Sequence, residues 1–236
     1  MSWYGYDDYV PVGQKKAKAQ KQLQTLRKKN ANLAPVVIEG RKIAKTWWGQ
    51  AWCKNLESYA DFSNRIGRGS VYVKNGFVLD LQIEPGAVRA KVCGTRLYEI
   101  TIKIDPLGEQ VKSDIAGAVG HRIDSIESLV SGAFPEDLRA VFLQQGTGLF
   151  PTPKEIHMDC SCPDWAEMCK HVAAALYGVG ARLDEDPLLF FKLRGIGMSE
   201  FIKRSIDEKM KSLLRNAGKK TGRVMEEADL GELFGV

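Results

Sequence analysis

The sequence has no long hydrophobic run. No stretch of about 18 apolar residues occurs among its 236 residues, although a membrane-spanning helix needs that length. The first ten residues are aromatic and acidic, whereas a signal peptide starts with basic residues and continues with apolar ones. We therefore expect a cytoplasmic protein, or one associated with the nucleoid, that has no membrane partner.

The sequence also lacks the motifs of a catalytic site. The phosphate-binding pattern G-x-x-x-x-G-K-[ST] is absent, so any ATP hydrolysis would belong to a partner. His121 and His157 have no cysteine or serine at a spacing that suggests a catalytic pair, and a structural histidine is the commoner alternative for each. We expect a non-enzymatic protein with no catalytic residue and no small-molecule substrate.

Cysteine is scarce and unevenly distributed. Of five cysteines, three fall within ten residues beside a histidine, giving the set Cys160, Cys162, Cys169 and His171. In a reducing compartment such a group indicates a metal site and not disulfides. Zinc takes four nitrogen or sulfur ligands in a tetrahedron, and a structural site leaves no open position. We predict one structural Zn²⁺ on these four side chains; the alternative, free core cysteines beside a chance histidine, requires a dense coincidence.

The spacing of the four ligands predicts how they converge. The residues before Cys160 alternate in polarity, so on a strand Cys160 and Cys162 point to one side and His157 to the other, which excludes His157 as a ligand. On a helix, residues two apart are separated by about 200° around the axis. Cys169 is therefore expected just before a helix that carries His171 in its first turn.

Other residues near the cluster have supporting roles in this prediction. Asp164 is expected to cap the turn between the two ligand pairs. Trp165 is expected to lie over the thiolates, with an ordinary buried tryptophan as the alternative. Cys53 and Cys93 have no ligand types near them in sequence, so we expect both to be small core residues.

Positive charge is concentrated near the N-terminus. Residues 14–45 contain ten basic residues and one acidic residue, a net charge of +9, whereas the remainder of the chain carries −4. Such a stretch attracts polyanions, and we expect sequence-tolerant binding of DNA. The alternative is a solvated helix that only faces water. The candidate nucleic-acid-binding residues are Lys15, Lys16, Lys18, Lys21, Arg27, Lys28, Lys29 and Lys170.

Local patterns predict an α+β fold. Four β-like runs, 71–74, 77–83, 88–93 and 97–104, are separated by turn-forming dipeptides, with Asn75-Gly76 as a type I′ hairpin turn. We expect an antiparallel meander covered on one face by helices between residues 106 and 142, then a small strand-turn-helix finger. The expected segments are an aromatic N-terminus and basic helical arm (1–45), the α+β domain (46–150), the zinc finger (151–195), and a C-terminal amphipathic helix with an acidic tail (196–236).

The acidic tail, residues 225–234, is a candidate protein-binding segment. Its apolar residues Leu230, Leu233 and Phe234 are spaced to share one side of a short helix, which suits an amphipathic segment that folds into a groove on a partner. The alternative is a disordered end, or a tail that folds back on the chain's own basic arm.

Several motifs resemble one known family. The pattern Cys160-x-Cys162, a spacer and Cys169-x-His171 matches the SWIM zinc finger. The chain is also similar to the bacterial SWIM zinc-finger proteins that accompany SWI/SNF-type ATPases, in residues 47–52 (WWGQAW), 80–86 (DLQIEPG), 148–151 (GLFP) and 193–195 (LRG). This resemblance implies binding of DNA or protein without catalysis, and a SWI/SNF-type ATPase as partner. The alternative is a pure protein-protein adaptor of such an ATPase with no direct nucleic-acid binding.

Overall fold

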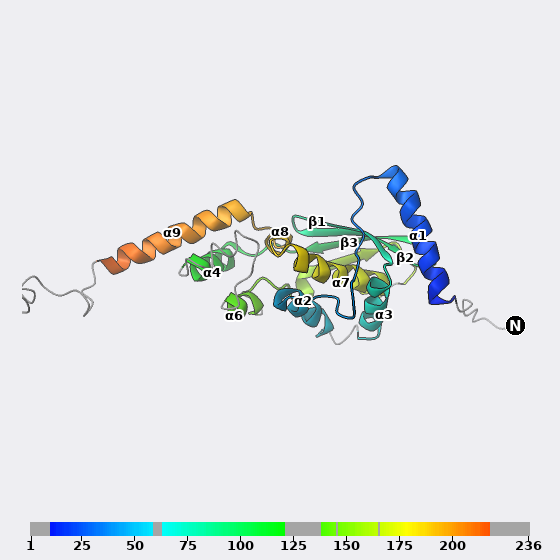
Figure 1. The fold of residues 1–236 in the computed structure, drawn as a ribbon. Helices are drawn as coiled ribbons and strands as arrows, with labels where there is room; N and C mark the ends of the chain where they lie inside the picture. The colour runs from blue at the N-terminus through cyan, green and yellow to red at the C-terminus, as the bar shows by residue number, and fades with distance from the viewer. Residues whose placement is uncertain (1–9, 59–62, 121–137, 145, 165, 218–236) are drawn as a thin grey trace, which may run out of the picture.

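The computed structural model describes residues 10–58, 63–120, 138–144, 146–164 and 166–217. Its centre is an antiparallel sheet of four strands in the order β1-β2-β3-β4 (Figure 1). The strands are β1 Val78–Glu84, β2 Ala87–Cys93, β3 Leu97–Ile104 and β4 Ile156–Cys160. Helices accompany this sheet and a further helix ends the described chain, so the predicted α+β fold class is confirmed.

Strand β3 shows why the sheet forms. Tyr98, Ile100, Ile102 and Ile104 are all buried, while the residues between them are exposed or half-buried. This alternation places one face of the strand in the core. β3 pairs with β2 on one side and with β4 on the other, and the last pair in the ladder toward the finger joins Ile100 to Cys160. The strand of the predicted finger therefore belongs to the same sheet as the meander.

One helix forms the other half of the core. Helix α7, Lys170–Glu185, contacts the sheet and also helices α2, Trp47–Glu57, and α3, Ser63–Lys74. Most of its residues are buried, many of them alanine or glycine, which lets neighbouring helices approach closely. Trp52 of α2 is fully buried and its indole N–H donates to the carbonyl of Leu176, at 2.8 Å. The helix of the predicted finger thus lies in the middle of the protein.

Residues 71–74 are not a strand, so this part of the prediction was wrong. They form the last turn of α3, and Asn75-Gly76 turns the chain from that helix into β1. The helix is favoured because Ile66, Gly69 and Val73 make a buried face at helical spacing. An added Cβ at Gly69 would lie 2.5 Å from the Ala173 side chain, so α3 packs directly on α7.

The helix after β3 does not cover the sheet as expected. Helix α4, Glu109–Gly120, packs on α9, Met198–Ala217, and the pair extends away from the sheet (Figure 1). The face it was expected to cover is occupied by α7. The short helix α6, Arg139–Leu143, contacts α4, whereas the short helix α8, Leu189–Leu193, contacts β1 and α7. The predicted apolar helix positions between 123 and 130 lie outside the described residues.

The basic arm is a helix, α1, Val12–Lys29. Ala19 is buried in the hydrophobic core and Leu23 and Leu26 pack against that core, while most of the other side chains of the helix are exposed. After it, the chain runs along the edge of β1: the Leu81 N–H donates to the carbonyl of Ala34, and the Val36 N–H donates to that of Val78. Within the described ranges, no helix is long and apolar enough to cross a membrane.

Candidate metal centre

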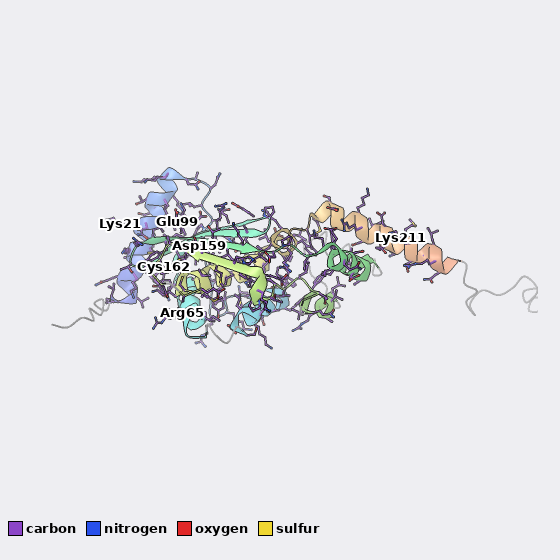
Figure 2. The ribbon with its side chains drawn as sticks, turned by 180° about the vertical axis from the view of Figure 1, so that it is seen from behind. Lys21, Arg65, Glu99, Asp159, Cys162 and Lys211 are labelled. Carbon is purple, nitrogen blue, oxygen red and sulfur yellow. The ribbon has the colours of Figure 1, made fainter. Side chains whose placement is uncertain are left out.

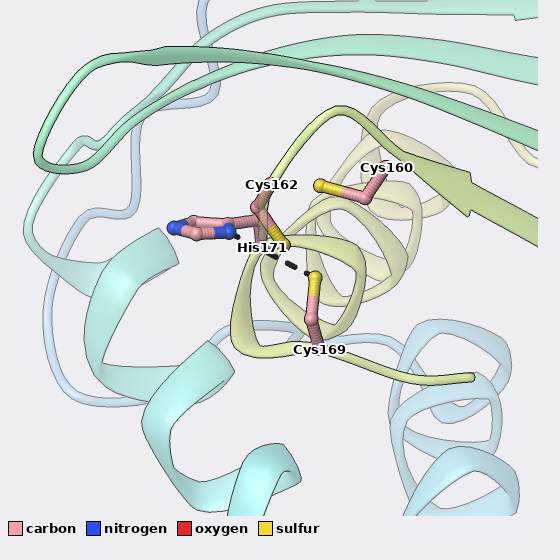
Figure 3. A group of neighbouring side chains, drawn as sticks. All are labelled: Cys160, Cys162, Cys169 and His171. Carbon is pink, nitrogen blue, oxygen red and sulfur yellow. Dashed lines mark hydrogen bonds between the residues drawn. The ribbon is translucent and has the colours of Figure 1, made fainter. Parts of the chain in front are cut away.

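The side chains of the four predicted ligands lie close together (Figure 3). Cys160 is the last residue of β4, and Cys162 follows in the bend after it. Cys169 is the N-cap of α7, and His171 lies in that helix's first turn. Cys169 just before the helix and His171 in its first turn are placed as the spacing predicted. Cys162, however, lies beyond the end of the strand that was expected to carry it, in the bend that follows.

The distances fit a metal with four ligands. The three Sγ atoms and the imidazole nitrogen all lie within 4.8 Å of one another, and Cys169 Sγ is 3.8 Å from His171 Nδ1. Zinc–sulfur and zinc–nitrogen bonds of usual length in a tetrahedron separate ligand atoms by roughly 3.6 to 3.8 Å. A small inward movement of the side chains would complete such a site, and the residues present could therefore hold a metal ion.

Cys169 has a lower pKa than an ordinary cysteine. The pKa of Cys169 falls to about 4, chiefly because the Cys160 thiol donates a hydrogen bond to it; His171 and the Val172 N–H contribute further. The pKa of Cys160 is correspondingly raised, and burial raises that of Cys162. A metal ion would therefore bind Cys169 as a thiolate that is already ionised, and its binding would displace protons from the other two thiols.

Aromatic rings hold the histidine in place. The ring of His171 lies 4.2 Å from that of Tyr98, between centroids, and 5.5 Å from that of Tyr72. Its Nε2 atom is buried without a hydrogen-bond partner. Gly94, in the turn between β2 and β3, lies directly against this nitrogen, where an added Cβ would be 2.9 Å away. Packing around Nε2, together with the contact of Nδ1 with Cys169 Sγ at 3.8 Å, therefore orients the imidazole toward the cysteines.

Asp164 stabilises the turn between the ligand pairs, as predicted. Its Oδ1 accepts from the Ala166 N–H at 3.2 Å, and its backbone carbonyl faces the Cys162 thiol. Arg65 of α3 forms an ion pair with it at 3.0 Å, and this bond is the first cause of the lowered pKa of Asp164. No sequence pattern indicates that Arg65, 99 residues before Asp164, reaches this turn. Trp165 lies outside the described residues.

The residues excluded as ligands lie away from the cluster. His157 is exposed, and its Nε2 is 3.0 Å from Oδ1 of Asp105. Cys93 is buried, as expected for a core residue. Cys53 is half-buried and packs against the core, and burial raises its pKa to about 12. Neither Cys53 nor Cys93 joins the cluster.

The candidate nucleic-acid-binding residues fall into two groups. The seven on α1 are all exposed: Lys15, Lys16, Lys18, Lys21, Arg27, Lys28 and Lys29. Lys170 lies between two of the metal ligands, and its Nζ is 5.9 Å from the centre of the Tyr72 ring. Figure 2 shows Lys21, Cys162 and Arg65 at the same end of the molecule, opposite Lys211 of α9. The candidate partner-binding residues Leu230, Leu233 and Phe234 lie outside the described residues.

Comparisons with known proteins give one relative of undetermined activity. "Uncharacterized protein Rv2102" of Mycobacterium tuberculosis is 38% identical over 156 residues, which cover 65% of this chain and 56% of the relative. The chain thus matches only about half of that protein's length. No family model matches the chain, and no solved structure matches it.

Proposed function

We propose that the protein is a non-enzymatic, zinc-binding accessory protein that binds DNA without sequence preference. Zinc is held by Cys160, Cys162, Cys169 and His171 and has a structural role. Helix α1 supplies the attraction to nucleic acid. A SWI/SNF-type ATPase is the proposed partner.

The donor set supports zinc and a structural role. Three thiolates and one imidazole are soft ligands that suit zinc, and they occupy all four positions of its tetrahedron. Such a site has no open position for a water or a substrate, so it is unsuited to hydrolysis. Zinc here would join the end of β4 to the start of α7, the two elements that carry the ligands.

The unpaired charge of α1 is the observation that carries the nucleic-acid proposal. This helix contains seven basic residues and no acidic one. All seven are exposed, and within the described part of the chain none forms an ion pair. By contrast, several basic residues elsewhere, such as Arg89 and Arg182, pair with a neighbouring carboxylate. Charge left unpaired on one helix favours a polyanionic ligand.

The length of the charged surface suits a duplex. Lys15 and Lys29 are fourteen residues apart, which is roughly 21 Å along a helix. A DNA duplex presents one phosphate charge per roughly 1.7 Å of its axis, about a dozen charges over that length. Contacts with phosphates give affinity without reading the sequence, so this surface would bind many sequences equally.

The ATPase partner is supported by the sequence motifs alone. The resemblance to SWIM proteins implies an associated SWI/SNF-type ATPase, which would supply the ATP hydrolysis for which this chain has no motif. The rival function, an adaptor of such an ATPase without nucleic-acid binding, makes a different experimental prediction. An adaptor would bind the ATPase through apolar contacts. Its affinity for DNA would not depend steeply on salt concentration.

Salt dependence of DNA binding tests the proposal. The zinc-loaded full chain is titrated with a labelled duplex at several salt concentrations, and anisotropy gives the slope of log K against log [salt]. We expect a steep negative slope that shrinks by about 0.9 for each phosphate contact removed. The arm variant changes Lys21, Arg27, Lys28 and Lys29 to Gln, which keeps helix propensity similar.

A matched control separates the arm from total charge. The control variant changes four exposed lysines on other elements to Gln: Lys103, Lys192, Lys203 and Lys211. It loses the same charge, and we expect its slope to stay near that of the unaltered chain. An arm variant that keeps the full slope, or one that behaves like the control, would show that α1 only faces solvent.

A further inference from the structure

A cavity of about 350 Å³ lies where α1 passes the turn between β2 and β3 and the start of α7. Lys15 and Lys18 line it from α1, Thr95 from the turn, Lys170 from α7 and Tyr72 from α3. Small-molecule pockets span roughly 300 to 1,000 Å³, so this one suits a ligand the size of a single nucleotide. We call these five residues and the space between them the nucleotide pocket.

The pocket is positively charged. Among the described residues that line it are three lysines and no carboxylate. Lys15 and Lys170 form no ion pair within the described residues, and Lys18 donates only to the backbone carbonyl of Thr95. The cavity beside Lys42 and Lys45 is different, because carboxylates also line it. The lysines of the nucleotide pocket are therefore available to an anionic ligand, for example a phosphate.

The pocket also has an aromatic wall. The ring of Tyr72 packs edge-on against that of Phe77, with 5.1 Å between their centroids, and both rings line the cavity. An aromatic ring beside several lysines is the combination by which proteins hold an unpaired base together with its phosphates.

We propose that the nucleotide pocket receives one unpaired nucleotide of a single-stranded nucleic acid, with the base against Tyr72 and the phosphates at Lys15, Lys18 and Lys170. This inference rests on the proposed binding of nucleic acid by α1 and names the form of the ligand. The bases of a duplex are stacked and paired, so their faces cannot enter a pocket unless the strand is opened. A duplex would contact α1 alone, whereas a single strand would contact α1 and the pocket.

The metal centre shapes this pocket. Lys170 is flanked in sequence by the ligands Cys169 and His171, and Gly94, another lining residue, lies against the His171 ring. Loss of metal should therefore displace Lys170 and the turn that carries Thr95. Most of α1 lies outside this contact and should keep its charge and its attraction to phosphates.

Four probes, used with the zinc-loaded full chain, test the inference. They are a labelled twelve-residue oligo(dT), a strand of the same length and charge without bases, a twelve-base-pair duplex, and free dTMP. We expect oligo(dT) to bind about five- to 150-fold more tightly than the abasic strand, the range that stacking of one base supplies. Free dTMP should bind much more weakly than the strand, because it reaches only Lys15 and Lys18 of α1 and makes no contact with the basic residues along the rest of that helix.

Variants test which residue is responsible for tighter binding of oligo(dT) than of the abasic strand. Tyr72→Ala should bring the ratio between oligo(dT) and the abasic strand close to one, whereas Tyr72→Phe should keep it because the ring remains. The arm variant at positions 21, 27, 28 and 29 should weaken both strands and leave the ratio unchanged. Because Tyr72→Ala could disturb folding, an oligonucleotide with 5-iododeoxyuridine is also crosslinked to the unaltered chain, and we expect the adduct on the peptide that contains Tyr72.

The outcomes separate the pocket from the arm. Equal affinity for oligo(dT) and the abasic strand, or a crosslink only at peptides remote from Tyr72, overturns the pocket while steep, salt-dependent duplex binding still upholds the proposed function. Binding of dTMP as tight as that of the strand overturns the single-strand assignment, because the ligand would then be a free nucleotide. Absence of binding to every probe overturns both proposals.

Discussion

Gly94 lies so close to His171 that a side chain would not fit between the turn and the ring. An ideal Cβ on Gly94 would be 2.9 Å from His171 Nε2 and 2.8 Å from Cε2 of Tyr98. These atoms belong to packed rings, which cannot move aside freely. The turn between β2 and β3 is therefore matched to the position of one metal ligand.

Gly94→Ala is expected to weaken both folding and metal binding. Overpacking of this kind costs about 1–3 kcal/mol, and rotation of the imidazole would move Nδ1 away from the cysteines. Urea unfolding and competition with a zinc chelator measure the two effects. Gly67→Ala is the control, since nothing lies within 4 Å of its added Cβ and alanine favours a helix. Equal zinc affinity in both variants would contradict the role given to Gly94.

Removal of the metal is expected to destabilise the whole sheet and not only the finger. Cys162→Ser should lose the single zinc per chain, and the loss of a structural metal is among the changes that cost more than about 4 kcal/mol. Because α7 contacts both the sheet and α3, amides in β1 to β3 should lose protection from hydrogen exchange together with those of α7.

His157→Ala is the control for this experiment. The side chain is exposed and pairs with Asp105 on the surface, so the variant should keep one zinc per chain by elemental analysis. A Cys162→Ser protein that retains full zinc would refute the ligand set. Full protection of β1 to β3 after zinc loss would show that the finger unfolds by itself.

The metal cluster was predictable because its ligands are close together in sequence and are recognisable by residue type and spacing. The cluster contains one C-x-C pair and one C-x-H pair. Their convergence follows from the side-chain periodicity of a strand and of a helix start, and both depend only on residues that are neighbours in sequence. His157 could be excluded by the same argument. The identity of the residues around the ligands was not predictable, since Arg65, Tyr72 and Gly94 come from other elements.

The errors in the fold have a common cause. Tyr72 and Val73 have strong β propensity, yet the segment is a helix whose buried face, Ile66, Gly69 and Val73, packs on α7. Tertiary contact outweighed local preference, as it often does for short segments. The position of α4 was missed for a similar reason, because nothing in its own sequence shows that α7 already covers the sheet.

Glu155 is expected to contribute stability that is lost in acid. Burial alone would raise its pKa, but hydrogen bonds from Arg194 and from Thr152 outweigh this and lower the pKa in the folded protein. A depressed pKa stabilises the fold above the unfolded value of about 4.3 and stops doing so as pH falls through the folded value. Urea unfolding between pH 3 and pH 7 should show this loss.

Glu155→Gln should remove that pH dependence and lower stability at pH 7. Arg194 is 1% exposed and 2.6 Å from Glu155, and leaving such a charge unpaired costs about 3–5 kcal/mol. We expect the lower end, because Arg194 also donates to the Asp105 carbonyl. Glu84→Gln, which breaks an exposed pair with Arg89, should cost less than about 1 kcal/mol. Equal costs would show that the Arg194 pair is solvated.

The turn at Asp164 is expected to control how fast zinc leaves. Its carboxylate holds the Ala166 N–H and the Arg65 guanidinium, and its carbonyl faces the Cys162 thiol. Groups that orient metal ligands typically contribute 10- to 100-fold in affinity. Asp164→Ala should therefore release zinc to a coloured chelator about 10- to 100-fold faster.

Two further variants separate the contacts of Asp164. Asp164→Asn keeps an oxygen for the Ala166 N–H but loses the ion pair, so it should release zinc at a rate between those of Asp164→Ala and the unaltered chain. Arg65→Ala should match Asp164→Asn, and the double variant should add little, because both changes remove the same ion pair. The pair is partly exposed, with side chains 39% and 34% accessible, so thermal stability of the metal-loaded protein should change little. Release from Asp164→Ala at the rate of the unaltered chain would mean that the cysteines and histidine hold zinc without help from this turn.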